Sequence, residues 1–143
     1  MDRKNSFRLE LITPERVLID KDVDSAVVPS GIGPIGILPG HAPLLGILAI
    51  GIMKVREAGN SEFRMFVDRG FFKISHEGVT IIAQSAEPQD QIDTDRAIAA
   101  RERAKNLLAS KDPGIDMERA QYALLRAETR TKVAEGAVYY LIL

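Results

Sequence analysis

Arginines that follow two aspartates are the residues of this sequence with the clearest capacity for chemistry. The pattern Ile-Asp-x-x-Arg-Ala occurs twice, at residues 92–97 and 115–120. In each copy we expect the aspartate to cap a helix by accepting hydrogen bonds from free N–H groups of the first turn. The arginine is unexpected there, because a cation in the first turn opposes the helix dipole.

More arginines continue along both segments. Arg103 lies seven residues after Arg96. On the second segment, Arg126 and Arg130 share a helical face with Arg119. These arginines form either a solvated face, neutralised by neighbouring glutamates, or an anion site that closes when the two helices pack together. Guanidinium groups suit the second role because their paired N–H groups match phosphate oxygens.

The elements that carry these arginines are two helices joined by a short turn. Residues 93–110 and 116–135 are dominated by Ala, Leu, Arg, Glu and Lys, which are strong helix formers. The connection at 110–114 is so short that the helices must run antiparallel. A hairpin of this size buries little area by itself, so we expect it to need a domain or partner against which to pack.

The chain before Glu87 is predicted to be all β. Short Val-, Ile- and Phe-rich runs alternate with Gly, Pro, Asn and Asp, and residues 7–14 show the two-residue period of a strand with one wet face. Residues 42–53 are predicted to be a buried strand pair. The fold class is therefore β plus α: an antiparallel β-sandwich at 1–88, followed by an antiparallel helical hairpin at 89–143 that ends in an apolar tail at 136–143.

Composition narrows the possible functions. The 143 residues are 45% hydrophobic, and 19 basic against 20 acidic residues give a formal charge of -1, which argues against bulk nucleic-acid binding. The absence of cysteine excludes disulfides and thiolate chemistry. We find no signal peptide and no apolar run long enough to span a membrane.

Two features resemble parts of other functional sites, a dinucleotide-binding loop and a catalytic or metal-binding histidine, but neither is completed by the residues around it. Residues 31–36 read Gly-x-Gly-x-x-Gly, but Pro34 and Pro39 prevent the helix that a dinucleotide site needs, so we interpret this stretch as a loop. His41 has no second ligand or base near it in the sequence, so a structural or interface role is favoured. We find no catalytic constellation and no metal site.

Four segments of the chain are distinctive: GILPGHAPLL at 36–45, VTIIAQSAE at 79–87, IDTDRA at 92–97 and LLRAETRTKVAE at 124–135. Together they resemble one family, the epsilon subunit of the bacterial F-type ATP synthase. The resemblance extends over about residues 7–135 and implies the same sandwich and hairpin.

The resemblance implies a non-catalytic rotor subunit of the central stalk. Such a subunit joins the gamma subunit of the shaft to the membrane ring of c subunits in a proton- or sodium-translocating synthase. It lies peripherally at the cytoplasmic face of the bacterial plasma membrane. Its hairpin regulates ATP hydrolysis and reaches the catalytic alpha and beta subunits when extended. The alternative function is a free-standing ATP-sensing module.

The resemblance also implies ATP as a regulatory ligand, with no cofactor required. The positions that match the family's ATP site are Glu87, Ile92, Asp93, Arg96, Ala97, Arg103, Arg126 and Arg130. The arginines would pair with phosphates, and the carboxylates would accept hydrogen bonds from adenine or ribose. The copy at 115–120 matches no ligand position, which favours a capping role.

A loop implied to contact the membrane ring contains Pro39, Gly40 and His41. In the family an acidic residue usually lies shortly before this loop. This chain has Pro34 and Ile35 there instead, which puts one polar contact with the ring in question.

Overall fold

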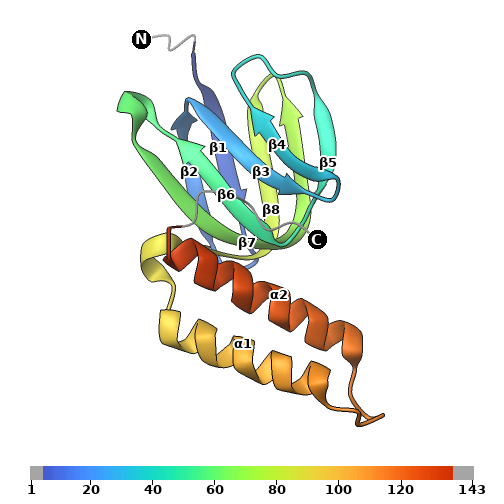
Figure 1. Cartoon of the computed structure of the whole chain (residues 1–143). Helices are drawn as coiled ribbons and strands as arrows, with labels where there is room; N and C mark the ends of the chain where they lie inside the picture. Colours follow the sequence, from blue (N-terminus) through green and yellow to red (C-terminus); the bar gives the residue numbers. More distant parts are fainter. Residues whose placement is uncertain (1–4, 137–143) are drawn as a thin grey trace.

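The protein is described by a computed structural model over residues 5–136. Figure 1 shows a β-sandwich with a helical hairpin packed against one end of it. The apolar tail predicted at 136–143 lies, apart from Gly136, outside the described residues. Within residues 5–136, neither helix is long and apolar enough to cross a membrane.

The sandwich is built from one folded sheet. Its strands are β1 Phe7–Ile12, β2 Val17–Val23, β3 Ser25–Ser30, β4 Gly33–Ile37, β5 Leu44–Leu48, β6 Gly51–Arg56, β7 Glu62–Ser75 and β8 Gly78–Pro88. The strand order is β2-β1-β8-β7-β5-β3-β4, and β6 pairs with β3 and β7. All neighbouring strands are antiparallel except β1 and β8, which run parallel. The predicted sandwich is therefore confirmed, with one parallel pair that the sequence analysis did not foresee.

Alternating side chains place the core between the two layers. Leu9 and Leu11 of β1 are completely buried, whereas Arg8 is exposed and Glu10, between the two leucines, is half-buried. The same alternation puts Val67 of β7 and Ile81 of β8 into the core. The two-residue alternation of apolar and polar side chains, which predicted strands with one solvent-exposed face, therefore positions the core.

The helices begin where their aspartates predict. They are α1 Thr94–Ala109 and α2 Met117–Ala134. Asp93 Oδ1 accepts a hydrogen bond from the backbone N–H of Arg96 at 3.0 Å. Asp116 Oδ1 accepts one from Arg119 at 3.1 Å. The capping role of both motif copies is confirmed.

The hairpin packs through small residues and docks through α2. Ala97 and Ala104 of α1 are buried, as are Ala120 and Ala127 of α2, so the helices approach closely. Figure 1 shows α2 between the sandwich and α1. A separate hydrophobic cluster joins α2 to the sheet and consists of Ile50, Ile52, Phe66 and Val133.

Two sequence expectations were wrong. Only residues 31 and 32 of the predicted loop at 31–36 form a turn, because Gly33–Ile37 is strand β4, paired with β3. The predicted buried pair at 42–53 is buried along β6 but, in β5, only at Leu48. In β5, Leu45 is 73% exposed and Ile47 is 65% exposed. The hairpin covers the outer face of β6 and β7. Within the described residues, it leaves Leu45 and Ile47 of β5 uncovered.

Candidate anion-binding site

A cleft lies where the start of α1, the end of α2 and the end of β8 come together. Its volume is about 380 Å³. The lining residues are Glu87, Gln91, Asp93, Arg96, Ala97, Ala100, Arg103 and Arg130. Three guanidinium groups and two carboxylates therefore face one small space, and we refer to it as the first cleft.

Arg130 connects α2 to the sandwich at this cleft. Its Nε donates a hydrogen bond to Glu87 Oε1 at 2.7 Å. Its guanidinium lies over the Phe66 ring, 4.3 Å from the ring centroid. An arginine held at Nε by a carboxylate and stacked on a ring is fixed in position, while its terminal nitrogens remain available to an anion.

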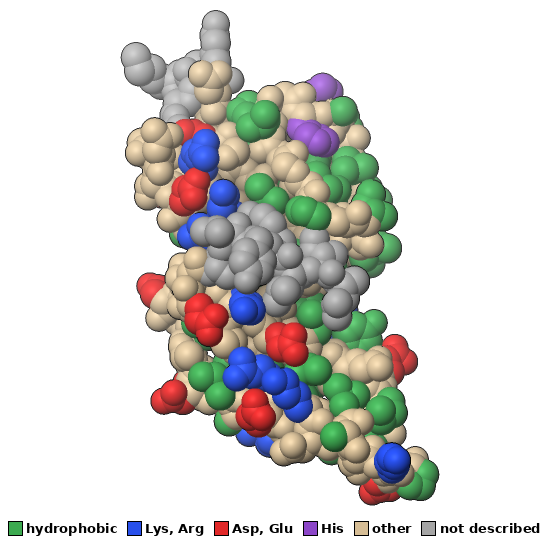
Figure 2. All heavy atoms as spheres, viewed as in Figure 1, with side chains coloured by type: hydrophobic (Ala, Val, Ile, Leu, Met, Phe, Trp, Pro, Cys, Tyr) green, Lys and Arg blue, Asp and Glu red, His purple; other side chains and the backbone are tan. Residues whose placement is uncertain are grey.

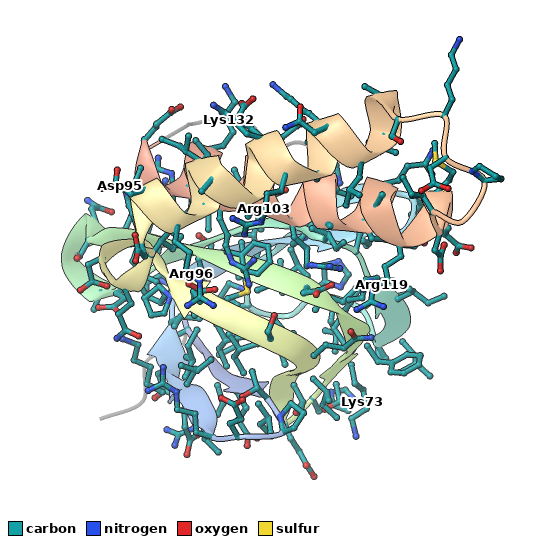
Figure 3. The ribbon with its side chains drawn as sticks, turned by 90° about the horizontal axis from the view of Figure 1, so that it is seen from below. Lys73, Asp95, Arg96, Arg103, Arg119 and Lys132 are labelled. Carbon is teal, nitrogen blue, oxygen red and sulfur yellow. The ribbon has the colours of Figure 1, made fainter. Side chains whose placement is uncertain are left out.

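Arg96 and Arg103 contribute two more cations from one side of α1. Residues seven apart lie about two helical turns apart on the same face. Figure 3 shows both side chains extending from the same side of α1, away from Asp95 and Lys132. Within residues 5–136, neither guanidinium has a hydrogen bond or ion pair to another side chain. The two groups are therefore free to bind an external anion.

Asp93 and Ala97 shape the rim of the cleft. One carboxylate oxygen of Asp93 caps α1, which leaves the other oxygen able to accept a hydrogen bond from a ligand. Ala97 is buried at the helix–helix contact and its small side chain keeps the cleft open. Both residues come from the first motif copy, so helix capping and cleft formation share the same residues.

Six of the eight residues predicted for the ATP site line the first cleft: Glu87, Asp93, Arg96, Ala97, Arg103 and Arg130. The other two lie elsewhere. Ile92 packs against the hydrophobic cluster that holds Phe66. Arg126 lines a different cleft, together with Arg69 and Tyr122.

Three residues of the site were missed by the sequence analysis. Gln91 lines the first cleft, and its Oε1 also accepts a hydrogen bond from Arg16 at 3.2 Å. Ala100 lies between Arg96 and Arg103 on α1, so helical spacing would have revealed it. Phe66 carries no local signal, because only the docking of α2 brings it to Arg130.

The predicted ring-contact loop lies at the end of the sandwich away from the hairpin. Gly40 and His41 line a cleft of about 500 Å³ there, together with His76 from the β7–β8 turn. Figure 2 shows the histidine side chains at this end, while charged side chains of both signs gather over the hairpin. The His41 ring is held by a contact of 2.7 Å between Nδ1 and the Ala42 carbonyl oxygen. In the described part of the chain, no group of three or more potential ligands is arranged to hold a metal ion.

The fold and the cleft define a class of protein: a β-sandwich with a docked helical hairpin, in which arginines gather between the two parts. Comparison with known families agrees with this class. The ATP synthase delta/epsilon chain β-sandwich domain matches residues 6–89, and the long α-helix domain of the same chains matches residues 90–135. The chain belongs to the ATP synthase delta/epsilon chain family. The resemblance noted in the sequence is confirmed.

Individual relatives show the same relationship. The ATP synthase epsilon chain of Desulforamulus reducens is 41% identical over 90% of this chain and 96% of its own length. The ATP synthase epsilon chain of Moorella thermoacetica is 41% identical over 93% of this chain and 98% of its own length. A protein of this family is a non-catalytic stalk subunit and not an enzyme on its own, as the sequence analysis predicted.

Solved structures share the fold. A chain of the Euglena gracilis mitochondrial ATP synthase OSCP/F1/c-ring structure superposes with a TM-score of 0.81 at 23% identity, covering 97% of this chain and 85% of its own. A chain of the Tetrahymena thermophila mitochondrial ATP synthase central stalk and c-ring gives 0.56 at 14% identity, covering 96% and 100%. At these identities the comparison supports the fold alone.

Proposed function

We propose that this protein is the epsilon-type rotor subunit of a bacterial F-type ATP synthase, with an ATP-sensitive hairpin that regulates hydrolysis. Its sandwich joins the gamma subunit of the shaft to the ring of c subunits, at the cytoplasmic face of the plasma membrane. The match of both domains to one family supports the assignment to the complex. The first cleft supports the regulatory part.

An uncovered apolar strip on the sandwich is the proposed contact with the gamma subunit. Ile47 of β5, Phe71 of β7 and Ile82 of β8 are 65%, 60% and 52% exposed. They are register neighbours on three adjacent strands, with Ile47 opposite Phe71 and Phe71 opposite Ile82. A contiguous apolar strip of this kind is typical of a protein interface. The loop at Pro39, Gly40 and His41 remains the proposed contact with the c subunits.

The hairpin is the proposed regulatory element. In the compact form α2 is docked through Phe66 and through the Arg130–Glu87 pair. In the extended form α2, which carries four basic and two acidic residues, would reach an acidic surface of the catalytic subunits and block rotation. A ligand that binds only the compact form stabilises it by RT ln(1 + [L]/Kd) and shifts the population toward it.

ATP is the proposed ligand of the first cleft. Arg96, Arg103 and Arg130 would bind its phosphates, and Glu87 and Asp93 would accept hydrogen bonds from adenine or ribose. Because the cleft includes residues of both helices and of β8, it is complete only while the hairpin is docked. This dependence of the site on docking is the single observation that carries the regulatory proposal.

Isothermal titration of the whole chain with ATP tests this function. We expect saturable binding, and we expect Arg103→Ala to weaken it about tenfold or more, the effect of losing a charge-assisted hydrogen bond. Lys105→Ala is the matched control, because Lys105 is also a cation of α1 but does not line the cleft. Absence of heat from the unmodified chain at millimolar ATP would contradict the regulatory proposal. Failure to co-purify with a gamma subunit would contradict the rotor assignment.

A further inference from the structure

A second cleft lies between β7 and the first half of α2. Its volume is about 360 Å³, and its lining residues are Arg69, Asp116, Glu118, Arg119, Tyr122 and Arg126. Like the first cleft, it is lined by three arginines and two carboxylates. Figure 3 shows Arg119 beside the start of α2, toward the end of the hairpin opposite Arg96.

The second motif copy supplies two arginines to this cleft at the same spacing as the first. Arg119 and Arg126 are seven residues apart, as are Arg96 and Arg103. In both copies the capping aspartate and both arginines line one cleft. The duplication therefore extends beyond capping, which would require neither arginine.

The third arginine is anchored in the same way in both clefts. Arg69 Nε pairs with Asp68 Oδ1 at 2.9 Å, and its guanidinium lies 4.2 Å from the centroid of the Tyr122 ring. Arg130 has the corresponding pair with Glu87 and the corresponding stacking on Phe66. Because Asp68 is almost completely buried, Arg69 is held firmly at the cleft that it lines.

Arg119 and Arg126 lack internal partners. Among residues 5–136, neither guanidinium has a hydrogen bond or ion pair. The Asp116 carboxylate already accepts the backbone N–H of Arg119. Two free guanidinium groups and one anchored one, separated by a small open space, match a compact anion with several oxygens, since each fork binds two oxygens.

We propose that the second cleft is a separate binding site for a phosphate-class anion, either free inorganic phosphate or diphosphate or the terminal phosphates of a nucleotide. Arg126 would thus bind this anion and not the ligand of the first cleft. A bound anion connects β7 to α2 and so stabilises the docked hairpin. The ligands of both clefts require the docked hairpin. Binding of either ligand therefore raises the affinity of the protein for the other.

An amide NMR titration of the whole chain with sodium pyrophosphate tests the site, with ionic strength held constant by sodium chloride. We expect saturable shifts at Arg119, Tyr122 and Arg126. Arg119→Ala should weaken this response about tenfold. Lys111→Ala, which removes an exposed cation from the hairpin turn, should leave it unchanged.

Further titrations identify the anion and separate the two clefts. Saturation by phosphate or pyrophosphate supports a free inorganic ligand, and saturation by ATP alone supports the phosphates of a nucleotide. Arg103→Ala should weaken the ATP response at the first cleft and leave the second intact, so failure of the first site does not affect this test. A response that saturates with none of phosphate, pyrophosphate and ATP, or one unchanged by Arg119→Ala, would overturn the proposal. So would loss of the ATP response of Arg96 and Arg103 in Arg126→Ala.

Discussion

Arg130 of α2 and Glu87 of β8 are 43 residues apart in the chain, and their side chains meet at 2.7 Å between Nε and Oε1. This ion pair lies inside the first cleft and connects the hairpin to the sandwich. The protein thus has a link that holds the compact form without any ligand. An anion in the cleft adds to that link, because it would bind the terminal nitrogens of the same arginine.

Replacing Glu87 by Gln should loosen the hairpin. The pair is partly exposed, with 28% and 33% of its side chains accessible, so its loss should cost only about 0.2–1 kcal/mol of docking free energy. Hydrogen exchange of the α2 amides should become faster. Glu62→Gln is the control, because Glu62 pairs with Arg56 and Lys54 of β6 and with no described residue of the hairpin, so its loss should leave α2 exchange unchanged.

Removing the Phe66 ring should have a larger effect. Phe66 is completely buried in the cluster that docks α2, and Phe66→Ala should cost about 3–5 kcal/mol through lost burial and a cavity. Phe66→Leu keeps most of the burial but removes the ring beneath Arg130, which should cost about 0.5–2 kcal/mol. Urea denaturation measures both values. A loss close to zero in Phe66→Leu would show that the ring has no role beyond its volume.

Asp93 should have a second role that Asp116 lacks in ATP binding. Ser retains the N-cap, so Asp93→Ser and Asp116→Ser should each change the free energy of unfolding by less than about 0.5 kcal/mol. Only Asp93→Ser should weaken ATP binding, because only Asp93 lines the first cleft. Thermal denaturation and ATP titration of both variants give the comparison. Equal ATP affinities in the two would remove the Asp93 carboxylate from the proposed site.

The apolar strip of the sandwich should be needed for assembly and not for folding. Phe71→Ser should leave the unfolding free energy within about 0.5 kcal/mol, because the side chain is largely exposed. It should reduce co-purification with the gamma subunit. Val17→Ser is the control, since Val17 is similarly exposed, at 56%, but lies on β2 at the far edge of the sheet. Unreduced co-purification of Phe71→Ser would exclude the strip as the contact.

Much of the fold could be predicted from local sequence signals. The helices were expected at 93–110 and 116–135 and occur at Thr94–Ala109 and Met117–Ala134, because Asp93 and Asp116 mark their starts unambiguously. Each of these features depends on residues that are close together in the chain.

The parts that were missed depend on contacts between distant residues. The exposure of Ile47 follows from the area of sheet that the hairpin leaves uncovered, which no local pattern specifies. Arg126 and Arg130 lie four residues apart on one helix, but Arg130 stacks on Phe66 and lines the first cleft, whereas Arg126 lines the second cleft with Arg69. Helical periodicity could group these two arginines, but it could not separate them.

The most direct test of the regulatory account is hydrogen exchange along α2, measured on the whole chain with and without ATP. If ATP occupies the first cleft and favours the docked hairpin, α2 amides should exchange more slowly with ATP. At an ATP concentration that just saturates the unmodified chain, Arg103→Ala should reduce that protection, and Lys105→Ala should retain it. Exchange in the unmodified chain that is unchanged or accelerated by saturating ATP would contradict the account.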